Sequence, residues 1–148
     1  MNGNGFDVSQ LTDFGQEILE VATKDMPKLT ERFMKSEAQR LRNKAKKKAR
    51  TELKSHKAKE GKSYIERMKA GKKVYAYGDA KYNVMVYNTA PHAHLIEDGH
   101  KMVTHKGEII GFVPGKHILE NSTIAFEETF LKDIETKLAS KVIKEMEK

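Results

Sequence analysis

Cysteine is absent from this chain of 148 residues. Its absence excludes disulfide bonds, thiol catalysis and Cys-ligated zinc, and it fits a protein that folds in a reducing cytosol. No apolar run approaches the ~20 residues that a membrane helix needs, so we expect no membrane contact. The first ten residues lack a basic segment followed by an apolar one, so we also expect no signal peptide.

Motifs of hydrolytic enzymes are missing as well. None of the serines lies in a Gly-x-Ser-x-Gly elbow. Glu97 and Asp98 could act as an acid–base pair, but adjacent carboxylates at a turn more often end a helix or form salt bridges. We therefore predict no catalytic residues, no cofactor and no enzyme.

Histidines are concentrated in residues 88–119, which hold five of the six. Imidazoles beside the carboxylate of Glu97 are good ligands for zinc or iron. The helical His-Glu-x-x-His spacing is absent, however, and the same rings could lie at a turn, a sheet edge or a subunit contact. We predict no metal, with a His-rich metalloenzyme as an open alternative. The five histidines are His92, His94, His100, His105 and His117.

The charge is unevenly distributed. Charged residues make up 33% of the chain and hydrophobic residues only 38%, and the net charge is +7. Residues 35–73 contain 16 Lys and Arg against 4 Asp and Glu, a net of +12 that leaves −5 for the rest. A basic segment of this kind predicts contact with phosphates or with an acidic partner.

The densest part of the basic segment is the helix expected over residues 40–50. It contains no aromatic side chains for stacking on bases, so sequence readout is not expected. A solvated helix face and nonspecific DNA contact both remain open. The residues that could contact DNA or an acidic partner are Arg40, Arg42, Lys44, Lys46, Lys47, Lys48 and Arg50.

Two helices are expected before residue 56. Asp7 and Gln10 have the spacing of a capping box, followed by apolar residues at helical intervals. The sequence Asp25-Met26-Pro27 predicts a break and a restart. The second helix is expected over residues 28–55, where the apolar stripe is thin, so it would pack loosely or project.

The second half of the chain predicts two hairpins and a final helix. Segments 73–77 and 81–87 alternate apolar and polar residues around a Gly-Asp-Ala turn, and segments 102–105 and 108–112 flank Lys106-Gly107. A helix over residues 117–148 would bury Ile124, Leu131, Ile134, Leu138 and Val142. The order predicts an α+β fold: one domain with a small antiparallel sheet packed with a long C-terminal helix (72–148), preceded by helices over residues 7–55.

Residues 90–100, Ala-Pro-His-Ala-His-Leu-Ile-Glu-Asp-Gly-His, resemble the segment "apYAhlvE-Gh" of the phage HK97 gp10-like family. These are small tail-component proteins of long-tailed phages and prophages. The layout of residues 29–148 is similar to that family, and the motif likeness is specific over residues 86–119, which include Gly-Phe-Val-Pro-Gly before the last helix. His92 stands where the family usually has Tyr, so no role is carried over for that ring.

The resemblance implies a structural protein of the tail or neck, involved in head–tail joining or tail completion, in the virion or in the host bacterial cytoplasm during assembly. It implies homo-oligomeric rings, often of six subunits, around the DNA channel. Tail-tube, connector or other neck proteins would be its partners. It gives no catalytic residues; the matched positions read as fold-defining, and they are Ala93, His94, Glu97, Gly99 and Gly115. Gly99 is expected to end a short helix with a positive φ.

Overall fold

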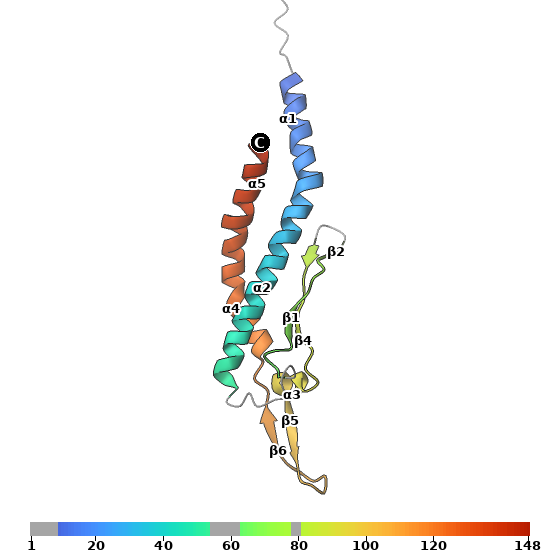
Figure 1. Cartoon of the computed structure of the whole chain (residues 1–148), viewed down its shortest axis with the longest axis vertical. Helices are drawn as coiled ribbons and strands as arrows, with labels where there is room; N and C mark the ends of the chain where they lie inside the picture. Colours follow the sequence, from blue (N-terminus) through green and yellow to red (C-terminus); the bar gives the residue numbers. More distant parts are fainter. Residues whose placement is uncertain (1–8, 54–62, 78–80) are drawn as a thin grey trace, which may run out of the picture.

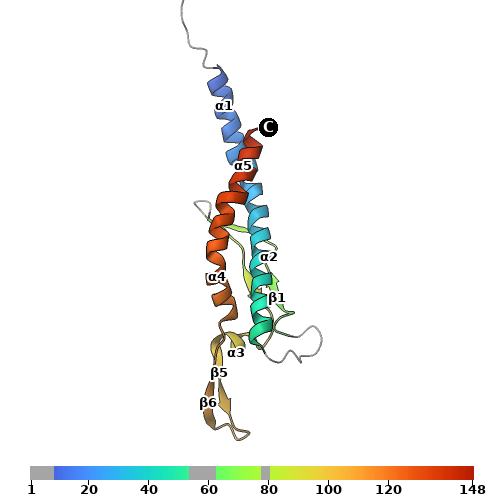
Figure 2. The same cartoon turned by 90° about the vertical axis from the view of Figure 1, so that its left-hand side faces the viewer.

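The computed structural model describes residues 9–53, 63–77 and 81–148. Two long helical segments run in opposite directions, and short strands lie beside one of them (Figure 1). A hairpin extends past the end of the helices, and the view turned by 90° shows the same elongated arrangement (Figure 2). None of the helices in the described ranges is long and apolar enough to cross a membrane.

The first helical segment is continuous. Helix α1 (Ser9–Glu20) passes through a π-helical turn η1 (Val21–Asp25) into α2 (Met26–Glu52). The predicted break at Pro27 is therefore wrong. Pro27 lies in the first turn of α2, and the preceding N–H, that of Met26, donates to the carbonyl of Val21 instead of to a carbonyl four residues back. Asp7 and Ser55, which the predicted helix ends required, lie outside the described residues.

The second helical segment comprises α4 (Ile118–Asp133), the π-helical turn η2 (Ile134–Leu138) and α5 (Ala139–Met146). The predicted buried stripe is wrong for Ile124 and Leu131, which are 64% and 54% exposed. The buried positions of α4 lie on a different face, at Ile118, Ser122, Phe126 and Asp133. Two of these are polar, so the apolar pattern alone pointed to the wrong face.

The contact between α2 and α4 is aromatic at its centre and ionic at its edge. The rings of Phe33 and Phe130 stack with centroids 5.9 Å apart, and Phe130 also lies against Phe126. Beside them, the buried Asp133 pairs with Arg40 and, at 3.0 Å, with Lys137. The long basic helix is thus packed against the C-terminal helix along this face.

In the part of the chain that the structure describes, the strands form three separate two-stranded antiparallel sheets. Strand β2 (Tyr75–Tyr77) pairs with β3 (Lys81–Asn83), which gives the first predicted hairpin; its turn, residues 78–80, lies outside the described residues. Strand β4 (Val86–Asn88) pairs with β1 (Met68–Ala70), a strand that was not predicted. Side chains from Tyr82 to Tyr87 alternate between half-buried and exposed, as the pattern predicts.

The second predicted hairpin is confirmed and is longer than expected. Strand β5 (Gly99–Val103) pairs with β6 (Ile109–Pro114), with a bulge in β6 between the partners of Met102 and Val103. The turn contains Gly107 with φ of 86°. At its base the hairpin follows the short helix α3 (Ala93–Asp98), and β6 ends at Pro114.

The buried core lies between α2, the segment that leads into β1, and the start of α4. It joins Ala45 and Ala49 of α2 with Tyr64, Met68 and Ile118. The small size of the alanines lets the backbone of α2 approach these side chains closely. The α+β class is confirmed; the division into helices 7–55 and a core 72–148 stays a prediction, and the cluster draws on both.

Candidate functional site

The motif at residues 90–100 comprises the turn that follows β4, helix α3 and the first two residues of β5. The amide of Ala93 donates to the carbonyl of Ala90 at 3.0 Å, which closes the turn before α3. Upstream, the Asn88 side chain accepts from the amide of Ala90 at 2.8 Å and donates to the carbonyl of Tyr64 at 2.6 Å. The unit is thereby fixed to the segment before β1.

Glu97, near the end of α3, connects three segments. The backbone amide of Leu119 donates to both carboxylate oxygens of Glu97, at 3.2 and 3.3 Å. Leu119 is in the first turn of α4, whose positive end favours an anion. A backbone hydrogen bond also joins α3 to the residues just before α4, because the amide of Lys116 donates to the carbonyl of Ile96 at 2.7 Å.

Tyr64 completes this junction. Its hydroxyl donates a hydrogen bond to Oε1 of Glu97, and the residue is only 3% exposed. Burial, and then the hydrogen bond to Glu97, raises the pKa of Tyr64 far above its ordinary value. The hydroxyl therefore remains a donor, and the Glu97 carboxylate is occupied by internal partners.

Two glycines make the close approach of backbones at this junction possible. Gly99 ends α3 with φ of 85°, and a Cβ there would lie 2.7 Å from the amide nitrogen of Gly115. A Cβ at Gly115 would lie 2.6 Å from the carbonyl carbon of Asp98. Both positions need glycine because main chain packs directly on main chain.

Ala93 packs against the buried core, and the histidines of residues 88–119 differ in exposure. His94, His100 and His105 are exposed, His92 and Ala93 are half-buried, and His117 lies 3.2 Å from Glu120. Within residues 9–53, 63–77 and 81–148, no group of three or more His, Asp or Glu side chains could hold a metal ion. His56, the sixth histidine, lies outside these ranges.

The seven predicted basic contact residues separate into two groups. Three are used within the molecule: Arg40 pairs with Glu37 and Asp133, Lys44 donates to the carbonyl of Ala125 at 2.7 Å, and Lys48 lies 3.0 Å from Glu52. Arg40 and Lys44 also lie over the ring of Phe126. Arg40 and Lys44 therefore help to hold α2 against α4, whereas the Lys48–Glu52 pair lies within α2.

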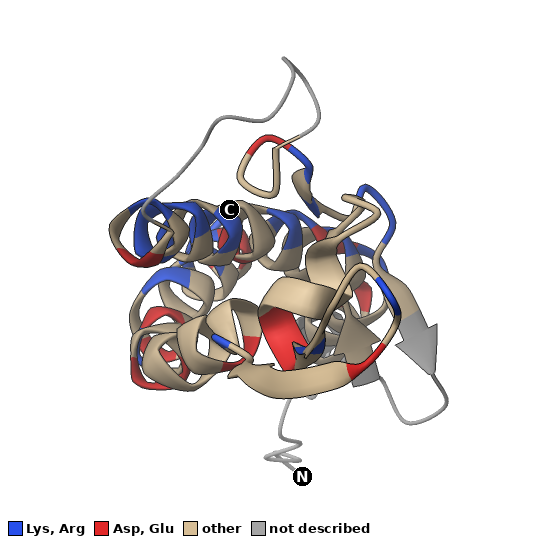
Figure 3. Ribbon diagram, turned by 90° about the horizontal axis from the view of Figure 1, so that it is seen from below, with Lys and Arg blue, Asp and Glu red and all other residues tan. Residues whose placement is uncertain are grey.

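The other four residues form what we call the basic row: Arg42, Lys46, Lys47 and Arg50. Lys47 and Arg50 are exposed, and the four residues are separate from the ion pairs that Arg40 and Lys48 form with Glu37, Asp133 and Glu52. Burial, and then repulsion from Arg42 and Arg50, lowers the pKa of Lys46. Figure 3 shows Lys and Arg positions recurring along α2. Arg42 and Lys46 are half-buried, so Lys47 and Arg50 are the members of the basic row that are more open to solvent.

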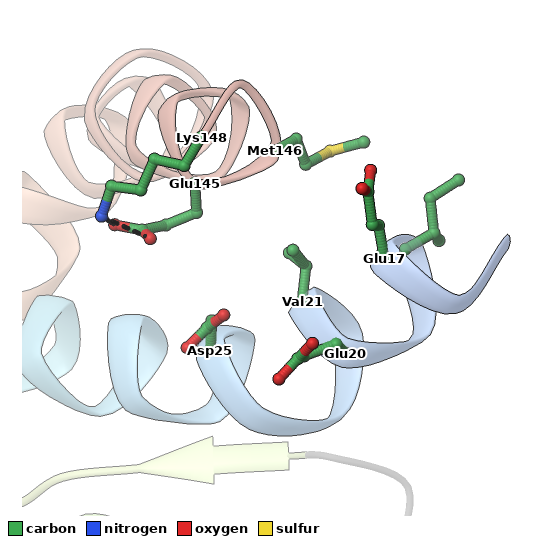
Figure 4. A pocket seen from close by; sticks show the side chains of 8 residues that line it. Glu17, Glu20, Val21, Asp25, Glu145, Met146 and Lys148 are labelled. Atoms are coloured by element: carbon green, nitrogen blue, oxygen red, sulfur yellow. Dashed lines mark hydrogen bonds and ion pairs between the residues drawn. The ribbon is translucent and has the colours of Figure 1, made fainter. Parts of the chain in front are cut away.

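An acidic hollow lies at the other end of the two helical segments, away from the hairpin β5–β6. Glu17, Glu20, Asp25 and Glu145 line a space of about 230 Å³ between the first helical segment and the end of α5 (Figure 4). Lys148 lies 2.7 Å from Glu145 and neutralises part of this charge. We assign it no function.

Reasoning from the sequence missed two residues of the junction, Tyr64 and Asn88. Their partners are 33 and 24 residues away along the chain, so no local spacing connects them. The only signal was indirect: an isolated Tyr in a polar segment that precedes an alternating strand pattern.

Comparison with known proteins places this unit in a family. The family model described as "Bacteriophage HK97-gp10, putative tail-component" matches residues 12–99. The match includes Ala93, His94, Glu97 and Gly99, and it ends before Gly115. No curated protein and no solved structure matches the chain. Because the matched residues make up more than half of the sequence, the chain belongs to the HK97 gp10-like family of bacteriophage tail components.

Proposed function

We propose that this protein is a structural component of the phage tail or neck that acts in head–tail joining or tail completion. It would act through protein–protein contacts in a homo-oligomeric ring, and not as an enzyme. The family match is the observation that carries the proposal. Tail-tube, connector or other neck proteins are the partners we expect, within the virion or in the host cytoplasm during assembly.

The geometry of the motif supports a structural role. Glu97, the carboxylate that could have served an acid–base reaction, is held by Tyr64 and by the amide of Leu119. Gly99 and Gly115 are explained by backbone packing. The motif thus positions the hairpin and the start of α4, and we propose Ala93, His94, Glu97, Gly99 and Gly115 as fold-defining positions.

Deletion of the gene from a phage or prophage that carries it tests the proposal. We expect particles in which heads and tails remain separate, or tails that are incomplete, when lysates are viewed by electron microscopy. Expression of the protein in trans should restore infectious particles. Wild-type titres and joined particles without the protein would contradict the proposal.

Nonspecific DNA binding by the basic row is the second candidate function. The observation in its favour is that Arg42, Lys46, Lys47 and Arg50 lie close together on α2 and that Lys47 and Arg50 are exposed. Each phosphate contact would release counterions, so binding would weaken steeply with salt. A ring lined by this row could contact DNA in its channel.

A salt titration tests this candidate. Replacing Lys47→Gln and Arg50→Gln should reduce the slope of log K against log salt by about 2, since each contact contributes about 0.9. Lys141→Gln with Lys144→Gln is the matched control, because it removes the same charge from exposed positions of α5. Equal slopes for both double variants would exclude the basic row as a DNA contact.

A further inference from the structure

Several apolar side chains of the hairpin β5–β6 are largely exposed. Ile109, Ile110 and Phe112 are 62%, 65% and 59% exposed, and Val103 on the facing strand is 58% exposed. The hairpin contacts α3 at its base and then points away from the helices (Figure 1, Figure 2). An isolated two-stranded hairpin is marginally stable in water, and an apolar patch of this kind indicates a contact surface.

A second apolar surface lies on the flank of the helices, and we call it the flank groove. It is a hollow of about 430 Å³ between α2, the residues around β4, and α4. Ile124, whose side chain is 64% exposed, is at its α4 wall. The apolar side chains that line the rest of the groove include Met34, Leu41, Val84, Val86 and Phe130.

The two surfaces carry opposite charge: the hairpin is basic and the α4 side of the flank groove is acidic. The hairpin carries Lys101 and Lys106 against one acid, Glu108, and two histidines. Residues 118–131 of α4 contain three Glu and no Lys or Arg, and one of these, Glu127, lines the flank groove. Opposite charges around apolar centres steer association and fix its register.

We infer that the hairpin β5–β6 of one copy of this protein docks in the flank groove of the next copy. The hairpin points away from its own helices, so a chain does not fill its own groove in this arrangement. A projection and a matching groove at different places on one molecule make a head-to-tail contact, and such contacts close into rings when the rotation allows it. The inference rests on the proposed ring and names the surfaces that would build it.

Disulfide cross-linking tests this contact, because the chain has no cysteine of its own. Ile110→Cys places a thiol on the hairpin and Ile124→Cys one on the groove wall. After mild oxidation, a mixture of these two variants should give far more cross-linked dimer than either variant alone. Ile143→Cys, which is 55% exposed on α5, is the matched control for the groove position.

Three results would overturn the inference. Ile110→Cys alone could cross-link best, which would mean that hairpins pair with each other. Ile110→Cys could cross-link equally well to Ile124→Cys and Ile143→Cys. The wild type could also stay monomeric at every concentration.

A charge exchange gives a readout that does not depend on cysteine. Lys106→Glu and Glu127→Lys each change an exposed side chain, and each should weaken self-association by about tenfold. A mixture of the two variants, or a chain that carries both changes, should recover much of the lost self-association. If it does not, the two residues do not meet across the contact. If gene deletion disrupts tails while these tests fail, the proposed function stands and only the docking contact is wrong.

Discussion

The hydroxyl of Tyr64 donates a hydrogen bond to the carboxylate of Glu97, which also caps the first turn of α4 through the amide of Leu119. This pair joins the segment before β1 to the start of the C-terminal helix. The junction lies at the base of the hairpin β5–β6, because β5 follows α3 directly in the chain.

Removal of the Glu97 carboxylate should destabilise the fold. Glu97→Ala leaves the buried hydroxyl of Tyr64 and the amide of Leu119 without their acceptor, which should cost about 1–3 kcal/mol. Glu97→Gln keeps one acceptor oxygen and should cost less. Urea unfolding measures both, and Asp98→Ala, which removes an exposed carboxylate next to it, is the control. Equal losses for Glu97→Ala and Asp98→Ala would show that the junction is not stabilising.

Stability should depend on Tyr64 at alkaline pH. The folded state holds the pKa of Tyr64 above the ordinary value of 10.0, so the unfolded chain releases this proton first as the pH rises. The advantage of wild type over Tyr64→Phe should therefore be complete below about pH 10. Above it, the advantage should fall by up to about 1.4 kcal/mol per pH unit.

Unfolding of both proteins in urea at several pH values between about 8 and 11 measures this difference. Tyr87→Phe, which removes a hydroxyl at an exposed position, is the control. A constant advantage of wild type over Tyr64→Phe across that range would contradict the burial of Tyr64.

Two glycines with nearly the same φ should respond differently to alanine. Gly99 and Gly107 have φ of 85° and 86°, but a Cβ at Gly107 meets no atom within 4 Å. Gly107→Ala should cost about 1–2 kcal/mol for the positive φ alone. Gly99→Ala adds a collision with the backbone of Gly115 and should cost clearly more. Thermal unfolding of the two variants decides this, and equal losses would mean that the packing at Gly99 is loose.

Two phenylalanines should separate folding from assembly. Phe33 is 3% exposed and stacks on Phe130, so Phe33→Ala should cost about 3–5 kcal/mol of stability. Phe112 is 59% exposed on the hairpin, so Phe112→Ala should change stability by less than about 1 kcal/mol but weaken self-association. Denaturation and sedimentation of the same two variants measure the contrast. A Phe112→Ala protein that unfolds early but assembles normally would reverse our assignment.

Local chemistry made several elements predictable from the sequence. The Lys106-Gly107 turn, the end of α3 at Gly99 and the alternation from Tyr82 to Tyr87 each depend on neighbouring residues. Tertiary contacts decided the rest. Strand β1 has only three residues and exists through its pairing with β4, and α4 buries Ser122 and Asp133 while Ile124 faces solvent.

The candidate site was predictable to a similar extent. The motif residues Glu97 and Gly99 could be found from the resemblance, and the basic segment from its composition. Which basic residues find partners within the molecule could not be predicted, because the partners of Arg40 and Lys44, the Asp133 carboxylate and the carbonyl of Ala125, lie on the other long helical segment. The partners of Glu97 are likewise set by the fold and not by spacing along the chain.

Mass in solution tests the central claim most directly. Light scattering across concentration would be recorded for the protein alone, and then with the tail-tube and connector proteins of the same genome. The account predicts a ring-sized species or a stable complex with one of these partners. A monomer at every concentration that binds neither partner would contradict it.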